Sequence, residues 1–350
     1  MFDQSPWLEI RAREEDVERY LDGQMSQLPQ YVLRNQGLQD DIKSQIIKAV
    51  DGMFLLARLH LDSLRGKKSP KAIRQALEKL PTGSDAYDFA YKDVMERIES
   101  QLPDKTDLAK QVLSWITCAK RPLKAIELQE AIAVEVNESK LDKENLSDIV
   151  YMVSICAGLV NFDEESNIIR LVHYTTQEYF EQTKGDWFPD AQTYITTICF
   201  TYLSLNVFED RFCKTTKDFK GRLRSNQFFE YAATNWEHHA HKASILNQPL
   251  SQAAVKFFKS EAKVNASWQM LKLSKRFSWT GPSSSKRMFM VTAGIHLIAY
   301  FGVEGILKLL LDTGGFEIDL KRTMPEILDD DSFDSERTPL SYAVENGHKT

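Results

Sequence analysis

Two short apolar runs around a polar turn, set in an otherwise helical chain, constrain the fold more than any other feature of the sequence. The runs are residues 159–162 and 168–172, and residues 163–167 form the turn between them. This pattern predicts a β-hairpin. Directly afterwards the sequence T-T-Q-E fits a capping box, in which Thr175 is the N-cap and Glu178 is the third helical residue. A helix should therefore begin as soon as the hairpin ends.

The sequence before the hairpin predicts two helices. Pro122 suits the first turn of a helix, where no backbone amide hydrogen is needed, and residues 123–136 continue with a helical pattern. Residues 146–159 form a second helical pattern. The order helix, helix, hairpin, helix is typical of a winged helix, and the hairpin is its wing.

Most of the remaining chain, up to residue 285, also has apolar residues at every third or fourth position, which predicts helices. The loops between the early helices are short, so successive helices should pack as antiparallel neighbours. A break rich in glycine, proline and serine at residues 281–285 separates this region from the last part of the chain. The clearest predicted helices are residues 42–64, 87–98, 108–116, 194–205 and 227–238.

The last part contains a degenerate repeat. Residues 293–302 align with residues 338–348, 45 positions later, and the second copy begins with the pattern T-P-L-x-x-A. Both copies match the signature of ankyrin repeats, whose period is about 33 residues. The extra residues fall in an acidic loop at residues 326–336, which we expect to be a flexible insertion. Because ankyrin units need about three copies to bury their faces, the chain looks cut at its C-terminal end.

Several segments together carry a resemblance to a known family. The chain resembles the region that follows the nucleotide-binding core of fungal NACHT–ankyrin proteins, which are STAND-class, NLR-like receptors. Its winged-helix part is also similar to a module named after a GPI inositol-deacylase, although the chain has no G-x-S-x-G nucleophile elbow. The matching segments are residues 8–10, 15–21, 51–55, 113–115, 120–123, 156–159 and 171–180.

The resemblance implies four regions in a mostly α chain. Residues 1–105 would be the C-terminal remnant of the NACHT region with a helical domain, and residues 106–186 a winged-helix domain with a small β-hairpin wing. Residues 187–285 would form a helical connector. Residues 286–350 would begin an ankyrin solenoid, incomplete and interrupted by the acidic insertion at about 320–336. A NACHT module would precede Met1 in the full gene.

The resemblance also implies a nucleotide switch. In the family the NACHT core, helical domain and winged helix close around ADP, and His173 matches a histidine that contacts the phosphates. Met53 and Phe54 match the segment that packs on the adenine. Helix N-termini attract anions, and His173 lies just before one. The chain has no G-x-x-x-x-G-K-[ST] phosphate loop, so ADP or ATP would bind only in a longer form. For the chain as given, the simpler interpretation of His173, a junction histidine packed beside the wing, is favoured.

Other residues with chemical potential have simpler interpretations. The run Glu237–His241 invites a metal site, but no fourth ligand has suitable spacing, so we expect a solvated helix end. His296 matches the histidine of the ankyrin turn and should bond locally. The cysteines Cys118 and Cys156 lie in apolar sequence and should be reduced core thiols. We expect no catalytic residue and no metal.

Charge and hydropathy limit the partners. The net charge of −6 is a poor match for a phosphate backbone. We expect the basic clusters at residues 211–224 and 272–276 to be solvated faces. The longest apolar stretch, residues 149–162, is shorter than the ~20 residues of a membrane-spanning helix, and the N-terminus lacks a signal pattern. We therefore expect a cytoplasmic protein without a membrane partner.

Two function classes remain open. The first is a non-enzymatic regulatory and protein-interaction segment of a STAND-type signalling receptor, with the winged helix as a switch element and the ankyrin repeats as the surface for a protein partner. The alternative is a winged-helix nucleic-acid-binding protein. The predicted helix at residues 146–159 contains Asp148 and no Lys or Arg, which makes nucleic acid an unfavourable partner and favours a buried interior role for that helix.

Overall fold

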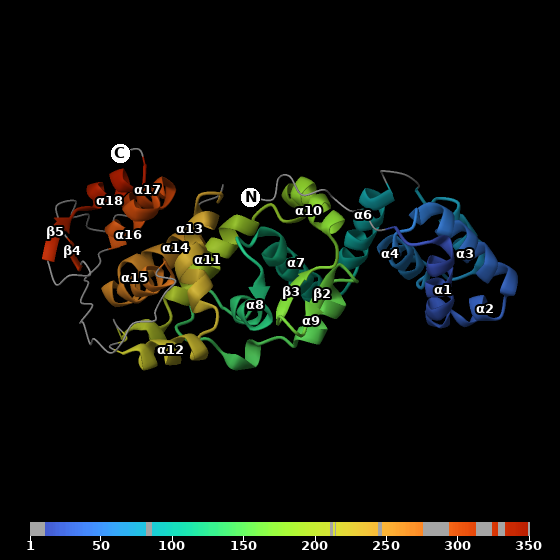
Figure 1. Ribbon diagram of the computed structural model, residues 1–350, viewed down its shortest axis with the longest axis horizontal. Helices are drawn as coiled ribbons and strands as arrows, with labels where there is room; N and C mark the ends of the chain where they lie inside the picture. Colours follow the sequence, from blue (N-terminus) through green and yellow to red (C-terminus); the bar gives the residue numbers. More distant parts are fainter. Residues whose placement is uncertain are drawn as a thin grey trace. The chain divides into compact units, whose positions relative to one another are not determined.

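The computed structural model describes residues 11–81, 86–210, 213, 215–243, 247–275, 294–312, 324–327 and 333–348. These residues are mostly α-helical, as the sequence predicts (Figure 1). The predicted segment at residues 8–10 and the break at residues 281–285 lie outside the described residues. The described residues fall into two compact units.

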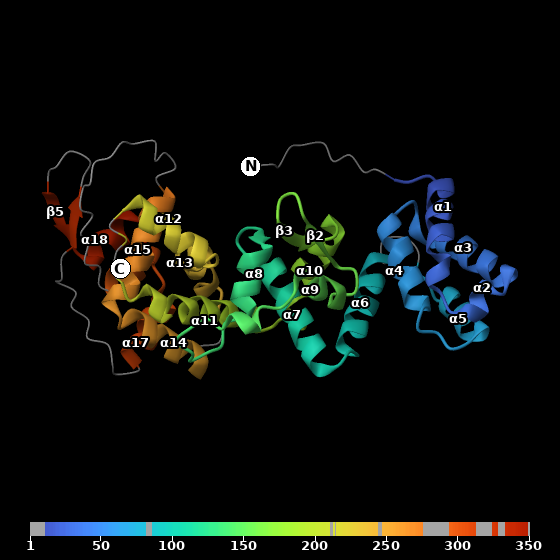
Figure 2. The same ribbon diagram turned by 90° about the horizontal axis from the view of Figure 1, so that it is seen from below.

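The first unit comprises the described residues of Met1–Ala109, together with Val153–Asn161 and Leu171–Thr183. In it, α4 packs against α1, α3 and α6, and α5 packs against α3. Figures 1 and 2 show the blue helices of this unit gathered in one bundle. Its helices are α1 (Glu14–Gln24), α2 (Gln30–Leu33), α3 (Gln36–Val50), α4 (Phe54–Leu64), α5 (Pro70–Leu77) and α6 (Ala86–Glu99).

Polar side chains at the helix starts fix where two of these helices begin. The Asn35 side chain accepts a hydrogen bond from the Leu38 amide at the start of α3. The Ser69 hydroxyl accepts one from the Ala72 amide, and Pro70 is the first residue of α5. Both arrangements satisfy amides that have no partner inside the helix.

The central part of the chain has the element order of a winged helix. A three-stranded antiparallel sheet has the order β1-β3-β2, and Leu123 and Lys124 of β1 pair with Ile169 and Ile168 of β3. The predicted hairpin is therefore confirmed. The elements are α7 (Pro103–Cys118), β1 (Leu123–Lys124), α8 (Ala125–Ile132), α9 (Ile149–Ile155), β2 (Val160–Asp163), β3 (Ile168–Leu171) and α10 (Tyr174–Trp187).

Three predicted boundaries in this part are wrong. Pro122 does not begin a helix: it precedes β1, because Leu123 and Lys124 pair with the wing before the chain turns into α8. Helix α9 is shorter than the predicted range of residues 146–159. Helix α10 already begins at Tyr174, so Thr175 lies inside the helix and is not its N-cap.

The second unit comprises the described residues of Lys110–Met152, Phe162–Arg170 and Lys184–Thr350. Helix α11 packs against α13 and α14, and α13 packs against α15. The Phe200 ring lies at the centre of this packing, 5.0 Å from the Trp236 ring and 5.6 Å from the Phe257 ring. The helices are α11 (Ala191–Leu203), α12 (Thr216–Ser225), α13 (Phe229–Ala240), α14 (Gln248–Phe258) and α15 (Glu261–Lys275).

The C-terminal residues of this unit form three further helices and a hairpin. Helix α16 contacts α15, α17 and α18, and the Thr338 hydroxyl caps α18 by accepting from the Ser341 amide. The expectation of a flexible acidic loop at residues 326–336 is wrong for its described residues, because β4 and β5 pair there antiparallel. The elements are α16 (Gly294–Phe301), α17 (Glu304–Asp312), β4 (Met324–Ile327), β5 (Phe333–Arg337) and α18 (Pro339–Glu345).

Candidate functional site

The turn that joins α3 to α4 carries two of the predicted site residues. The backbone of Asp51 and Gly52 is left-handed, with φ of 45° and 77°, and the Gly52 carbonyl accepts a hydrogen bond of 2.8 Å from the Ala12 amide. A Cβ on Gly52 would lie 2.6 Å from the Ala12 carbonyl oxygen. The turn thus requires glycine at this position. Met53, the residue before α4, is buried.

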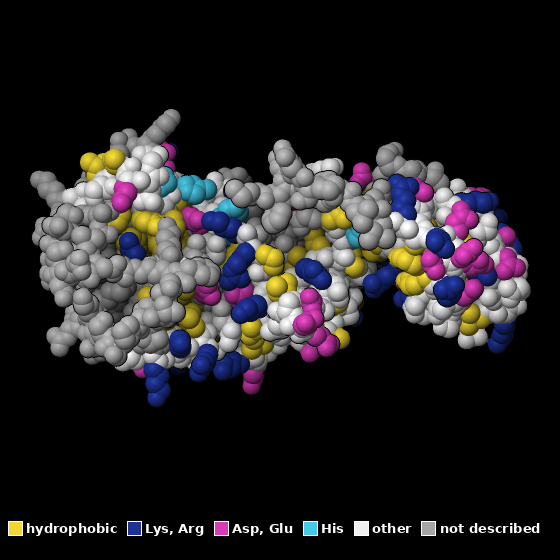
Figure 3. All heavy atoms as spheres, viewed as in Figure 1, with side chains coloured by type: hydrophobic (Ala, Val, Ile, Leu, Met, Phe, Trp, Pro, Cys, Tyr) yellow, Lys and Arg dark blue, Asp and Glu magenta, His cyan; other side chains and the backbone are white. Residues whose placement is uncertain are grey.

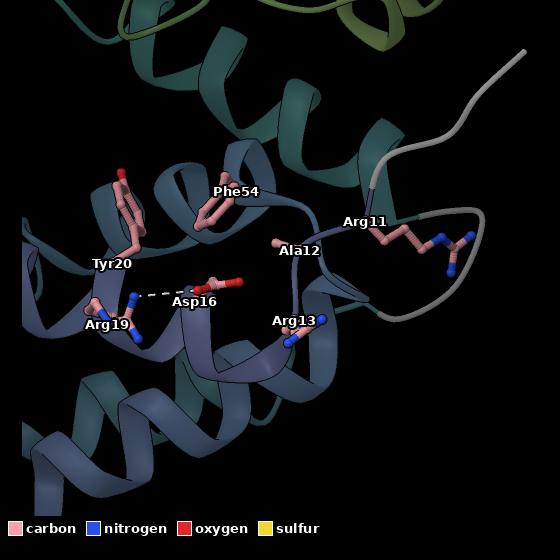
Figure 4. A pocket seen from close by; sticks show the side chains of 7 residues that line it. All are labelled: Arg11, Ala12, Arg13, Asp16, Arg19, Tyr20 and Phe54. Carbon is pink, nitrogen blue, oxygen red and sulfur yellow. Dashed lines mark ion pairs between the residues drawn. The ribbon is translucent and has the colours of Figure 1, made fainter.

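Phe54, the first residue of α4, is 45% exposed and lies on a pocket. Its ring meets the Tyr20 ring edge to face at 5.7 Å. In Figure 4 these two rings lie on one side, and the Arg11 side chain extends away from them. The pocket has a volume of about 600 Å³ and is lined by Arg11, Ala12, Arg13, Asp16, Arg19, Tyr20 and Phe54.

The charges around this pocket are partly paired. Arg19 lies 3.5 Å from Asp16, and Arg11 forms an ion pair with Asp51. The lining thus combines an aromatic edge with an excess of guanidinium groups, which suits a planar or anionic ligand. The sequence analysis missed Tyr20 and the arginines, since nothing in the local pattern shows that the start of α1 lies beside Phe54.

His173 lies immediately before α10 in the same unit, but it does not line the pocket. Its Nδ1 lies 2.8 Å from the Thr175 hydroxyl and accepts a longer bond of 3.3 Å from the Thr175 amide. The Thr175 hydroxyl lies in turn 2.6 Å from the hydroxyl of the buried Tyr91. His173 therefore takes the capping place that the sequence analysis gave to Thr175.

Burial lowers the pKa of His173 below its usual value, and the Glu178 carboxylate opposes this shift. A neutral imidazole at a helix N-terminus can still interact with an anion through a ring N–H. The structure thus separates the three predicted site residues: Phe54 lies on a pocket, Met53 is buried, and His173 belongs to a hydrogen-bond network with Thr175 and Tyr91.

The helix that precedes the wing, α9, has an exposed apolar side. Val150 is 72% exposed and Tyr151 is 42% exposed, whereas Met152 and Ile155 are buried. The expectation that this helix has a buried interior role is therefore wrong for the side that carries Val150 and Tyr151. The helical spacing of the buried Met152, Ile155 and Leu159 could have shown that Val150 and Tyr151 lie off that face.

Acidic groups flank this exposed side. The Asp148 carboxylate accepts a hydrogen bond of 2.9 Å from the Tyr151 amide at the start of α9. In the wing turn the Asp163 carboxylate accepts from the Glu165 amide, and Glu164 and Glu165 are exposed. Figure 3, seen from the side of Figure 1, shows acidic side chains gathered over α9 and the wing.

The basic residues between α7 and β1 contact α8 and α13 of the second unit. The Arg121 guanidinium donates to both carboxylate oxygens of Glu127, at 2.7 and 2.8 Å, and lies 5.1 Å from the centre of the Tyr231 ring. The Lys120 ammonium donates to Glu237 at 3.0 Å, and the Lys120 amide donates to the Tyr231 hydroxyl at 3.0 Å. The hydrogen bond to Glu127 raises the pKa of Arg121 further. These contacts anchor the chain before β1 to α13.

A buried carboxylate joins α8 to the same set of helices. Glu130 is 6% exposed, and its Oε2 accepts from the Tyr202 hydroxyl at 2.5 Å and from the Phe228 amide at 2.9 Å. A buried carboxylate is stable only when its oxygens are hydrogen-bonded. Glu130 therefore depends on residues that lie far along the chain.

The expectation of a solvated helix end is wrong for His239 in the histidine run at the end of α13, although His241 is exposed. His239 is fully buried, with Nε2 2.8 Å from the Tyr231 hydroxyl and Nδ1 2.8 Å from Gln192 Oε1. Burial lowers the pKa of His239 to about 3. The expectation failed because Tyr231 and Gln192 supply partners that local polarity does not reveal. Among the described residues no group of three or more His, Cys, Asp or Glu side chains is arranged to hold a metal ion.

The sequence analysis also singled out a histidine, two cysteines and the question of membrane spans. His296 lies in the first turn of α16, fully buried, with its ring centre 6.2 Å from that of Tyr342. Cys118 and Cys156 are buried thiols outside any disulfide, as the sequence predicts, and burial raises the pKa of Cys156 to about 12. None of the described helices combines the length and the apolar run that a bilayer crossing requires.

One comparison with known proteins decides the nature of the central part. Residues 95–186 match the family of the GPI inositol-deacylase winged helix domain. The chain contains a winged helix domain. The match covers α7 to β3 and most of α10. No protein among those with curated functions is similar to the chain, and no solved structure is similar to it either.

Proposed function

We propose that the chain is the non-enzymatic, regulatory part of a STAND-type signalling receptor of the fungal NACHT–ankyrin kind. The winged helix domain would be the switch element, and the C-terminal helices would be ankyrin units that bind a partner protein. The observation that carries this proposal is which residues the polar side chains of the winged helix domain contact. Lys120 and Glu130 bind residues of the helices that follow the domain, and Arg121 binds Glu127 within the domain while it lies over the Tyr231 ring.

These contacts can couple a movement of the later helices to a movement of the winged helix domain. Glu130 bonds to Tyr202 and Phe228, and Lys120 bonds to Tyr231 and Glu237. A partner that shifts α11 or α13 would therefore shift α8 with them. In α18, Leu340 and Val344 are 58% and 62% exposed, and apolar residues exposed on one helix side supply a contact surface for such a partner.

The nucleotide part of the proposal concerns a longer form of the protein. There His173 would contact the phosphates of ADP or ATP, and Met53 and Phe54 would contact the adenine. The exposed ring of Phe54 supports this assignment, whereas Met53 would have to act through the α4 N-terminus because its side chain is buried. Without the NACHT core we propose no cofactor and no catalysis for the chain.

The alternative function is nucleic-acid binding by the winged helix domain. It needs basic residues on α9 and free phosphate contacts, but residues 146–159 contain no Lys or Arg and Arg121 is paired with Glu127. A cytoplasmic protein that regulates through protein contacts fits these features better.

The two functions are separated by fluorescence anisotropy of the purified chain with labelled duplex DNA at physiological salt. We expect no saturable binding to duplex DNA. Tight binding that is lost in Lys124→Glu, a change at an exposed residue of the winged helix domain, would support the nucleic-acid function and contradict ours. An ATPase measurement on the same preparation should show no turnover, and turnover would contradict the non-enzymatic assignment.

A further inference from the structure

The exposed side of α9 is shaped by apolar residues that the helix itself does not need. We call Leu146, Ile149, Val150 and Tyr151 the α9 surface. Val150 is 72% exposed, and Tyr151 is 42% exposed. Leu146 and Ile149 are partly exposed beside them. A β-branched residue in an exposed helical position is unfavourable for helix formation and for hydration, so Val150 has no stabilising role within α9 that would explain it.

The surroundings of the α9 surface are acidic. Asp142, Glu144 and Asp148 precede or begin α9 and are exposed. In the wing turn Glu164 and Glu165 are exposed as well. Basic residues are fewer: Lys140 and Lys143 lie in the loop before α9, and Arg170 lies 3.7 Å from Asp163.

The wing turn contains an ionised carboxylate. Hydrogen bonds from Ser166 lower the pKa of the half-buried Asp163 carboxyl, with smaller contributions from the Glu165 amide and the Arg170 guanidinium. Asp163 thus stays ionised at neutral pH and orders the turn that presents Glu164 and Glu165. The wing turn and the start of α9 thus both carry exposed acidic side chains.

Resting on the proposed function, we infer that the α9 surface is the docking site for a basic and apolar peptide segment of a partner protein. Apolar side chains of the segment would cover Val150 and Tyr151, and its Lys or Arg residues would pair with the wing and with the acidic loop before α9. Duplex DNA would be repelled by the acidic groups, and so would an anionic membrane surface. A peptide with opposite charge complements both properties of the surface.

The test is a peptide-display selection from a random library on the immobilised full chain, with Val150→Lys as the counter-target. Val150→Lys removes the apolar contact and adds a charge that repels a basic segment. Peptides that bind the chain but not Val150→Lys should combine apolar residues with Lys or Arg. Enrichment of acidic peptides, or of the same peptides on both targets, would overturn the inference.

The affinity of an enriched peptide is then measured by anisotropy for three proteins. Val150→Lys should weaken binding by about tenfold or more, as expected for a central apolar contact, and higher salt should weaken binding to the unchanged chain. Val207→Lys is the matched control, because Val207 is another exposed valine of the second unit, in a different segment, and should bind as the unchanged chain does. Equal losses in the two variants would overturn the inference.

The other occupants give distinct results. If sedimentation velocity shows a dimer of the unchanged chain that Val150→Lys abolishes, the surface binds a second copy and the inference is wrong. Vesicles of anionic lipid that bind the chain and lose binding in Val150→Lys would also overturn it. Duplex binding would contradict both this inference and the proposed function, whereas a chain that binds neither DNA nor any selected peptide contradicts this inference alone.

Discussion

The Glu130 carboxylate accepts a hydrogen bond of 2.5 Å from the Tyr202 hydroxyl, and both side chains are buried. The same oxygen accepts from the Phe228 amide. This bond joins the winged helix domain to the helices after it through a carboxylate that is buried away from water. Burial and the neighbouring Glu130 charge raise the pKa of Tyr202 well above its usual value, so Tyr202 remains a donor.

We expect Glu130→Ala to destabilise the second unit strongly. The substitution leaves the Tyr202 hydroxyl and the Phe228 amide buried without an acceptor, at a cost of about 1–3 kcal/mol for each group. Tyr202→Phe removes only one bond and should cost about 1 kcal/mol. Urea unfolding measures both changes, with Glu135→Ala as the control because Glu135 is exposed. Equal stability of Glu130→Ala and Glu135→Ala would show that the buried bonds are dispensable.

Arg121→Lys should destabilise the chain by about 1 kcal/mol, although it keeps the charge. Lysine cannot donate two parallel hydrogen bonds to Glu127, and it stacks less well on the Tyr231 ring. The measurement is again urea unfolding. Arg224→Lys, at an exposed arginine of α12, serves as the control and should be neutral. A neutral Arg121→Lys would mean that charge alone, and not the paired geometry, holds this contact.

Gly52→Ala should destabilise the first unit by about 1–3 kcal/mol, because alanine is strained at positive φ and its Cβ would collide with the Ala12 carbonyl. Gly66→Ala is the matched control, since a Cβ on Gly66 would meet no neighbouring atom. Thermal unfolding compares the two variants. Hydrogen exchange of the Ala12 amide should also become faster in Gly52→Ala, and an unchanged rate would contradict the close approach seen here.

The stability of the chain should fall as the pH decreases below the ordinary histidine value of 6.5. Burial lowers the pKa of His239 to about 3 and that of His60 to about 4, so the unfolded chain binds more protons than the folded chain in this range. Each histidine then contributes a slope of at most about 1.4 kcal/mol per pH unit, and stability is lost toward acid.

His239→Gln should reduce that slope. We expect the variant to be less stable than the unchanged chain at neutral pH. It should lose less stability on acidification, because glutamine does not titrate. His60 accounts for part of the slope that remains. The free energy of unfolding is measured in urea between about pH 7 and about pH 5. An identical slope in His239→Gln would contradict the low pKa of the buried imidazole.

The sequence predicted those features that local patterns determine. The hairpin was predictable because its apolar runs and polar turn are contiguous, whereas the single helix predicted over residues 42–64 is divided into α3 and α4 by the left-handed turn at Asp51 and Gly52. Strand β1 was not predictable, because a strand of two residues has no period and exists only through its pairing with Ile168 and Ile169. For the site, the exposure of Phe54 and the burial of His239 depend on Tyr20, Tyr231 and Gln192, which lie on other helices.

The reach of Glu130 along the chain bears on how the protein is made. Its oxygen meets the Tyr202 hydroxyl, 72 residues later, and the Phe228 amide, 98 residues later, so a nascent chain emerging from the ribosome lacks the second of these partners until α13 has begun to appear. The winged helix domain therefore completes its folding only after the helices behind it are synthesised. A polypeptide that stops before Phe228 would expose the Glu130 side of α8 to chaperones and proteases.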